Sequence, residues 1–133
     1  MDQATRDTIA ECTKGSAEER MSFPEVVMRL AAAGVERYHA DLVRGEKTYY
    51  LPDGRSGRVA SGALEHAPAT AFDGAGVGAA VRAIQAGGIG YRGFCAAIAA
   101  AGCAGYIVTL AGRRAVYYGR TGETFVEPFP PAP

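Results

Sequence analysis

One sequence pattern occurs twice in the chain at a spacing of 68 residues, and this repeat constrains the fold more than any other feature. Residues 30–42 carry an aliphatic residue, three alanines and a glycine, followed by a tyrosine and a leucine, and residues 98–110 repeat that order. The spacing continues without a gap to the pairs Tyr49-Tyr50 and Tyr117-Tyr118. Self-similarity at a fixed period indicates a repeated supersecondary unit. Two copies are too few for a solenoid, so we expect one duplicated domain with an internal pseudo-twofold axis.

Each copy is predicted to contain two helices followed by a β-hairpin. The clearest helix start is Ser22-Phe23-Pro24-Glu25, where Ser22 and Glu25 form a capping box and Pro24 lies in the first turn. After each helix pair the apolar period changes from helical to alternating, which indicates strands. The predicted helices cover residues 2–12, 22–34, 74–85 and 91–101, and the predicted strands cover residues 35–43, 47–51, 105–110 and 114–118.

This pattern predicts an α+β fold in which the duplicated helix–helix–hairpin unit forms a four-stranded, mainly antiparallel sheet with its helices on one face. The pseudo-repeats cover about residues 2–51 and 74–119 of a single domain, residues 1–133. Residues 52–73 are predicted to be a connecting insert, and residues 128–133 a tail. Just before that tail, the segment that starts at Thr124 is a candidate edge strand.

Composition places the chain among ordinary globular proteins. A length of 133 residues is enough to bury a core without covalent staples. The odd set of Cys12, Cys95 and Cys103 argues against a disulfide framework, so we expect a reduced, cytoplasmic environment and assign the cysteines to the core. No apolar run approaches the length of a membrane span, and the acidic N-terminal residues do not resemble a signal peptide.

Charge is unevenly distributed although the net charge is zero. Residues 74–122 contain five arginines and no acidic residue. Such an asymmetry suits either the binding of an anion or the pairing of one molecule's basic half with another's acidic half. The simpler interpretation is a solvated surface with a locally biased composition.

Metal and nucleotide sites are not indicated. Residues 74–79 spell G-x-G-x-x-A, but no strand pattern precedes them, and the next acidic residue after Asp73 is Glu123. His39, His66 and the three cysteines include no pair at metal-ligand spacing. We therefore expect no metal and no cofactor.

Differences between the two copies are the best lead to function. His39 and Asp41 lie on one face of a predicted strand, where the second copy has Ile107 and Thr109. An imidazole beside a carboxylate can act as a general base, which makes this pair a weak catalytic candidate. No nucleophile can be placed next to it, and a polar sheet face open to water explains the pair as well. A second difference sets Glu46-Lys47 against Arg114-Ala115 in the other copy.

Tyrosines on the predicted hairpins form the second group of candidates. In each tyrosine pair one ring must point to the helices and the other to the opposite face. Tyrosines beside arginines suit single-stranded nucleic acid, but zero net charge makes that partner unlikely, and a sheet face covered by a second copy of the protein is favoured. Arg120 and Glu127 are charged anchors in this interpretation, and an ordinary surface ion pair is the alternative. The candidate ligand or interface residues are Tyr49, Tyr50, Tyr117, Tyr118, Arg114, Arg120 and Glu127.

Several segments together resemble a known family. They are residues 22–27, 34–42, 47–50, 85–91 and 101–120. Over nearly the whole chain they are similar to domain-of-unknown-function family 1398, the YbcV-like uncharacterised bacterial proteins. The resemblance implies a small, intracellular, single-domain bacterial protein, and it brings no catalytic residues with it.

The sequence thus predicts a non-catalytic binding or self-association module, expected to be a homodimer that forms through a sheet face or edge, with an unidentified protein or small molecule as its further partner. The alternative is a small enzyme or ligand-binding protein with a pocket near His39 and Asp41. That alternative requires His39 to be partly buried, to contact Asp41 or a tyrosine hydroxyl, and to line a concave pocket. Whether the protein is an enzyme stays open.

Overall fold

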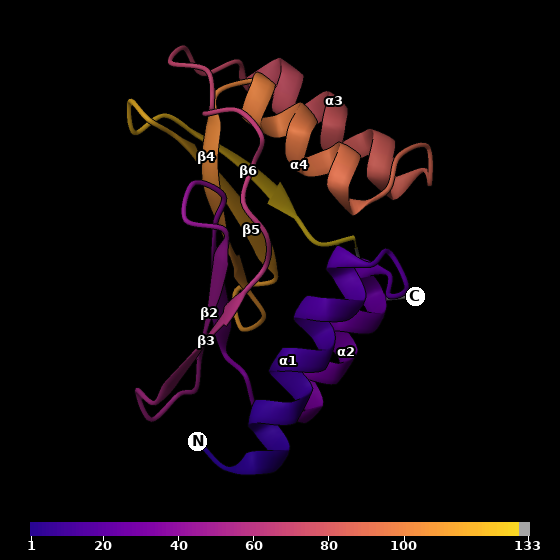
Figure 1. Cartoon of the computed structure of the whole chain (residues 1–133), viewed down its shortest axis with the longest axis vertical. Helices are drawn as coiled ribbons and strands as arrows, with labels where there is room; N and C mark the ends of the chain where they lie inside the picture. Colours follow the sequence, from indigo (N-terminus) through magenta and orange to yellow (C-terminus); the bar gives the residue numbers. More distant parts are fainter. Residues whose placement is uncertain (131–133) are drawn as a thin grey trace.

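The computed structural model of the chain describes residues 1–130. Within these residues, four helices pack against one face of a six-stranded antiparallel sheet, which confirms the α+β class (Figure 1). No helix in this part of the chain has the length and apolar character needed to cross a membrane. The elements are α1 (Gln3–Ala17), α2 (Phe23–Ala32), β1 (Arg37–Asp41), β2 (Glu46–Tyr50), β3 (Ser56–Ala60), α3 (Gly74–Gln85), α4 (Tyr91–Ala100), β4 (Cys103–Thr109), β5 (Arg114–Gly119) and β6 (Thr124–Pro128).

The sheet consists of two three-stranded halves joined at its centre. Its strand order is β3-β2-β1-β4-β5-β6, so β1 and β4 make the pairing between the halves. Their antiparallel register aligns His39 with Ile107, which is its own counterpart at the 68-residue spacing. A pseudo-twofold axis therefore passes between these two residues.

Element boundaries follow the same spacing. Helices α2 and α4 begin and end 68 residues apart, as do the edge strands β3 and β6. Backbone conformation follows it as well, because positions with a positive φ angle recur in pairs. These pairs are Glu19 and Gly87, Gly34 and Gly102, Gly45 and Arg113, and Gly54 and Gly122.

The predicted unit was wrong in one respect: each copy contributes three strands rather than a hairpin, so the sheet has six strands and not four. The missed strand β3 lies inside residues 52–73, which were predicted to be a connecting insert. Its sequence hides the strand, because Val59 is its only large apolar residue facing the helices. The other inward position is Gly57, where a Cβ atom would lie 2.8 Å from Ile9 Cδ1 of α1. The candidate edge strand near the C-terminus is β6; residues 131–133 of the predicted tail lie outside the described residues.

Helix α1 is longer than its apolar pattern predicted. The helix continues past Cys12 to Ala17 and buries the small residues Thr13, Gly15 and Ser16. A Cβ atom at Gly15 would lie 2.7 Å from the Met21 side chain, so this glycine makes room for the chain that follows the helix.

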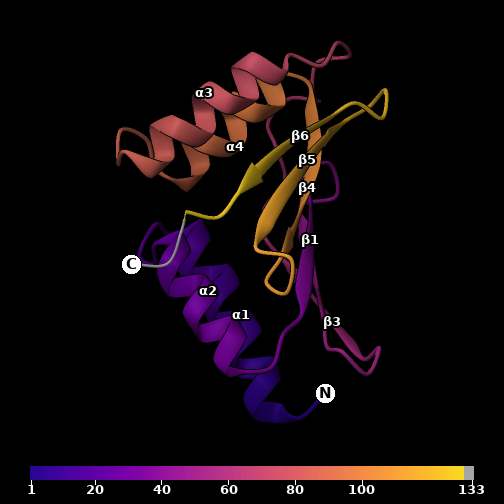
Figure 2. The ribbon, with the colours of Figure 1, turned by 180° about the vertical axis from the view of Figure 1, so that it is seen from behind.

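Buried tyrosines form the centre of the core. Tyr38 packs on Tyr49 with ring centroids 5.1 Å apart, and the symmetry-related Tyr106 and Tyr117 pack at 5.3 Å. Helix residues such as Leu30 and its counterpart Ile98 are fully buried in the same core. Figure 2 shows the two helix pairs on the same side of the sheet, with α3 and α4 towards one end of the molecule and α1 and α2 towards the other.

The two helix pairs are joined by a cap that crosses the pseudo-twofold axis. The residue before helix α4 is Gly90, which has no side chain to cap the helix. Its first turn is capped instead by Glu19, whose carboxylate accepts a hydrogen bond from the backbone nitrogen of Arg92 at 3.1 Å. The Arg92 side chain in turn donates to the carbonyl oxygen of Ala17 at 3.0 Å. A carboxylate at a helix N-terminus is also favoured by the helix dipole.

Gly34 and Gly102 provide a matched test of this duplicated backbone. The φ angle is +83° at Gly34 and +90° at Gly102, so both residues lie in the left-handed region. Gly34→Ala is expected to cost about 1 to 2 kcal/mol, because it adds backbone strain in open space. Gly102→Ala is expected to cost more than twice as much, since its Cβ atom also clashes with the backbone carbonyl of Ala71. Urea unfolding of the two variants measures the difference, and equal losses would contradict the described packing.

Candidate functional site

The sheet face opposite the helices, called here the open face, is divided into two chemically different halves. Across the middle of this face the strand registers align one residue from each strand, in the order Arg58, Thr48, His39, Ile107, Val116 and Val126. The first three are polar and belong to the first copy. The last three, called here the aliphatic row, belong to the second copy. Ile107 is 38% exposed and Val126 is 44% exposed, so no part of residues 1–130 covers the row.

His39 lies at the centre of the open face, beside the pseudo-twofold axis. It is half-buried, and its Nε2 atom is 2.6 Å from the hydroxyl of Tyr118. The Tyr118 ring reaches His39 across Gly105, a position with no room for a Cβ atom. Burial raises the pKa of Tyr118 to about 12, so its hydroxyl stays protonated and can donate a hydrogen bond. The two side chains line a shallow depression of about 410 Å³ with Arg37, Tyr38, Tyr50 and Ile107.

Asp41, the predicted partner of His39, forms hydrogen bonds with the backbone instead. Asp41 Oδ1 accepts hydrogen bonds from the backbone nitrogens of Val43 and Arg44, both at 3.0 Å, and so stabilises the β1–β2 turn. Within residues 1–130 no hydrogen bond joins Asp41 to His39. The structure thus places both residues on the open face, but it gives His39 a tyrosine partner rather than a carboxylate.

Charged groups on the first-copy half of the open face are paired within the molecule. Glu46 contacts Arg44 at 2.8 Å and Arg58 at 3.7 Å. Arg37 pairs with Glu36, and its guanidinium carbon lies 4.4 Å from the centre of the Tyr50 ring. This half is therefore polar without a strong net charge.

The predicted tyrosines divide between the two faces. Tyr49 and Tyr117 are buried under the helices, and Tyr50 and Tyr118 lie on the open face. The Tyr49 hydroxyl is 2.8 Å from the Thr13 hydroxyl of α1, a contact that fixes helix to sheet. The pairs thus include both core and surface residues rather than one tyrosine surface.

The predicted charged anchors do not meet. Arg120 donates hydrogen bonds to the carbonyl oxygen of Pro68 and the hydroxyl of Thr70, and so holds the connector between the copies. Glu127 accepts a bond from Gln85 at 3.4 Å, and Arg114 donates to the carbonyl oxygen of Gly112 at 3.3 Å. No ion pair links Arg120 to Glu127 in the described part of the chain.

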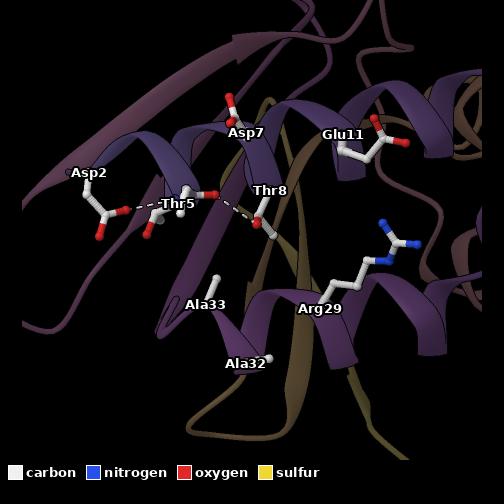
Figure 3. Close-up of a pocket in the computed structure, with 9 residues that line it drawn as sticks. Asp2, Thr5, Asp7, Thr8, Glu11, Arg29, Ala32 and Ala33 are labelled. Atoms are coloured by element: carbon white, nitrogen blue, oxygen red, sulfur yellow. Dashed lines mark hydrogen bonds between the residues drawn. The ribbon is translucent and has the colours of Figure 1, made fainter.

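Figure 3 shows a second hollow, a shallow groove of about 770 Å³ between α1 and α2. Its polar groups serve the helices: the Asp2 carboxylate accepts from the Thr5 nitrogen, and the Thr8 hydroxyl donates to the Ala4 carbonyl. Among residues 1–130, no three histidine, cysteine or acidic side chains gather as they would around a metal ion.

The G-x-G-x-x-A segment has a structural explanation at the start of α3. The Asp73 carboxylate accepts a hydrogen bond from the Gly76 nitrogen and so occupies the helix N-terminus. A Cβ atom at Gly78 would lie 3.1 Å from the Phe125 ring, which shows how closely α3 packs on β6. These glycines serve capping and packing.

The most unusual side chain is Lys47, which the sequence marked only as a difference between the copies. It lies on the helix-facing side of β2 and is 3% exposed. Its Nζ atom is 4.5 Å from the centre of the Tyr91 ring and 5.7 Å from that of Tyr38. Within residues 1–130 it has no ion pair and no hydrogen-bond partner. Its counterpart Ala115 is also buried.

Burial controls the protonation of this cluster. Loss of hydration lowers the pKa of Lys47 to about 8, and it raises the pKa values of the Tyr91, Tyr106 and Cys95 side chains. The Tyr91 and Tyr106 hydroxyls are 2.9 Å apart and share a hydrogen bond. Because these neighbours stay protonated, no anion balances a charge on Lys47.

Lys47→Met is expected to change how stability depends on pH. Between pH 8 and pH 10.5 the unfolded chain keeps the lysine proton that the folded chain has lost, so this residue makes stability rise with pH across that range. At pH 7 the buried lysine costs about 3 kcal/mol relative to an unperturbed one. The stability advantage of Lys47→Met over wild type should therefore shrink by about 2 to 3 kcal/mol from pH 7 to pH 10.

Urea unfolding at several pH values measures this difference. Comparing the variant with wild type cancels the opposing contributions of the buried tyrosines and thiols. Lys14→Met is the control, because Lys14 is exposed on α1 and its loss should leave the pH profile unchanged. Parallel profiles for wild type and Lys47→Met would show that Lys47 titrates normally in the folded protein.

Comparison with known protein families finds a match in the second half of the chain. Residues 69–127 match the model of a family described as "Protein of unknown function (DUF1398)". This segment includes α3 to β5 and most of β6, which together make up the second copy of the repeat. A search of the curated proteins finds no match to the chain. The second copy is therefore similar to a domain-of-unknown-function family, and this similarity assigns no role to any residue.

Proposed function

We propose that this protein is a binding module that associates with a second copy of itself through the open face. The observation that carries the proposal is the uncovered aliphatic row, Ile107, Val116 and Val126, at the centre of a sheet half that carries few charges. An antiparallel sheet usually buries apolar residues on one face and exposes polar ones on the other. Here the central row of the second-copy half is apolar on the open face as well, so an additional layer would bury apolar surface that is now in water.

A twofold axis running along the middle of the open face supports a second copy as that layer. Such an axis places each member of the aliphatic row opposite the same residue of the second copy. It also exchanges the residues on either side of the axis, because each strand is reversed. Arg37 then faces Asp41 of the second copy, and Arg114 faces Tyr118 of the second copy. Arg37 and Asp41 thus provide two symmetric pairs of opposite charge, while Arg58, in the central row, faces its own counterpart. Stacked sheets usually cross at about 30°.

Nucleic acid fits this face less well. Two of its arginines, Arg37 and Arg58, already contact carboxylates of the same chain. The net charge of the protein is zero. A surface that binds a phosphate backbone needs unpaired cations, which release counterions on binding.

The finer expectations from the sequence stand as parts of the same proposal. We place the whole chain, and not only residues 69–127, in the YbcV-like family, and we propose that it is a bacterial, cytoplasmic protein. The structural similarity between the two copies supports the extension to the first copy. The absence of a disulfide framework from the sequence supports the location.

Ile107→Asp is expected to convert a wild-type dimer to a monomer, because it places a carboxylate opposite another carboxylate at the centre of the interface. Sedimentation velocity at several concentrations measures the assembly state, and circular dichroism checks the fold. Met28→Asp is the matched control: Met28 is 70% exposed on α2, away from the sheet, and its loss should leave the dimer intact. A wild-type protein that stays monomeric at high concentration would overturn the proposal.

The alternative, a ligand site beside His39, is favoured by one observation. His39 is half-buried, contacts a tyrosine hydroxyl and lines a depression, as that hypothesis requires. Dimerisation through the aliphatic row would cover this depression, because Ile107 lines it, so the two functions compete for one surface. If the wild-type protein is monomeric, a small-molecule fragment screen by NMR that shifts the His39 and Tyr118 signals would support the alternative.

A further inference from the structure

Lys47 has no polar partner in the core. It is the only charged residue among the buried residues of the described chain, at 3% exposure. No carboxylate of residues 1–130 lies within ion-pair distance of it, and none of its neighbours supplies a hydrogen bond. A buried ionisable group usually has such a partner, because removing a charge from water is costly.

The fold does not require a lysine at this position. Its counterpart at the 68-residue spacing is Ala115, which is 5% exposed and faces the equivalent side of the sheet. The neighbouring pairs Tyr38 with Tyr49 and Tyr106 with Tyr117 pack alike in the two copies. Alanine is therefore sufficient for packing at this position, and the fold does not require the amine of Lys47.

The surroundings of the amine favour its neutral form. The faces of the Tyr91 and Tyr38 rings attract an ammonium group only weakly compared with a carboxylate. The phenol and thiol groups nearby remain protonated and offer no counter-charge. A desolvated lysine without a counter-ion is the usual form of a nucleophilic lysine.

Solvent reaches this amine. In the described residues, every side-chain nitrogen or oxygen atom that is sealed from solvent has a hydrogen-bond partner. Since Lys47 Nζ has none, it keeps a small contact with solvent. Tyr91, whose ring centre lies 4.5 Å from Nζ, is itself only half-buried. A small neutral molecule can use this approach more easily than a large one.

We propose that Lys47 is a nucleophilic amine that condenses with small aldehydes to form an imine. The lone pair of the neutral amine attacks the carbonyl carbon, and proton transfer gives a carbinolamine. The carbinolamine then loses its hydroxyl group and the proton on its nitrogen as one molecule of water, which leaves a carbon–nitrogen double bond. No oxidant, reductant or metal takes part, and water reverses the reaction.

The chain is well suited to a direct test, because Lys14 and Lys47 are its only lysines. The folded protein is treated with acetaldehyde and cyanoborohydride, which reduces an imine to a stable ethylated amine. Peptide mass spectrometry then compares the two lysines in the same molecule. At pH 7 we expect Lys47 to be ethylated more than about tenfold faster than the exposed Lys14, because a larger fraction of its amine is neutral.

Two further measurements test whether the folded structure, rather than ordinary lysine chemistry, causes the preference for Lys47. In about 8 M urea, which unfolds the chain, the preference for Lys47 should disappear, since both amines are then solvated. Pyridoxal, a bulky aldehyde, should modify Lys14 in preference to Lys47. Equal or faster ethylation of Lys14 in the folded protein would overturn the proposal, as would a preference for Lys47 that persists in urea. This test does not depend on whether the protein dimerises.

Discussion

The antiparallel pairing of β1 with β4 is the contact on which the whole structure depends. It joins two three-stranded sheets that would otherwise each have an open edge, and it brings the two pairs of helices over one continuous core. Because its register is centred on His39 and Ile107, the two copies are related by a near-twofold rotation rather than by a translation. That rotation places Tyr38 next to Tyr106, with ring centroids 6.4 Å apart, and so merges two small cores into one. The cap that Glu19 provides for α4 strengthens the same junction from the helical side.

On this nearly symmetric frame, the chemistry lies where the copies differ. The open face is polar over the first copy and aliphatic over the second, although the backbone beneath the two halves is equivalent. On the helix-facing side, one copy buries the amine of Lys47 where the other buries the methyl group of Ala115. Packing therefore explains what the copies share, and it leaves these departures unexplained. The two departures lie on opposite faces of the sheet, so the activities inferred from them are physically independent.

Sequence reasoning succeeded where local signals and tertiary packing agree. Helix α2 begins at the predicted cap, with the Ser22 hydroxyl accepting from the Glu25 nitrogen, and helix α4 begins at Tyr91 as predicted. It failed where small residues have tertiary roles. Gly57 hides an edge strand because it faces α1, and Gly15 lies inside a helix because Met21 packs against it. The partner of His39 was also out of reach, since Tyr118 is 79 residues away in the chain and meets it only through the register of three strands.

The register of the central strands also bears on how such a chain can arise. Each unit consists of two helices and three strands. Because the relation between the units is twofold, the first strand of one unit can pair with the same strand of another. Two separate copies of such a unit could assemble in the arrangement seen here, as an intermolecular dimer with a six-stranded sheet. The segment between Ala60 and Gly74 then acts as a tether that makes this assembly intramolecular. Gene fusion would thus remove the concentration dependence of an existing fold, and it would free each half to diverge on its own.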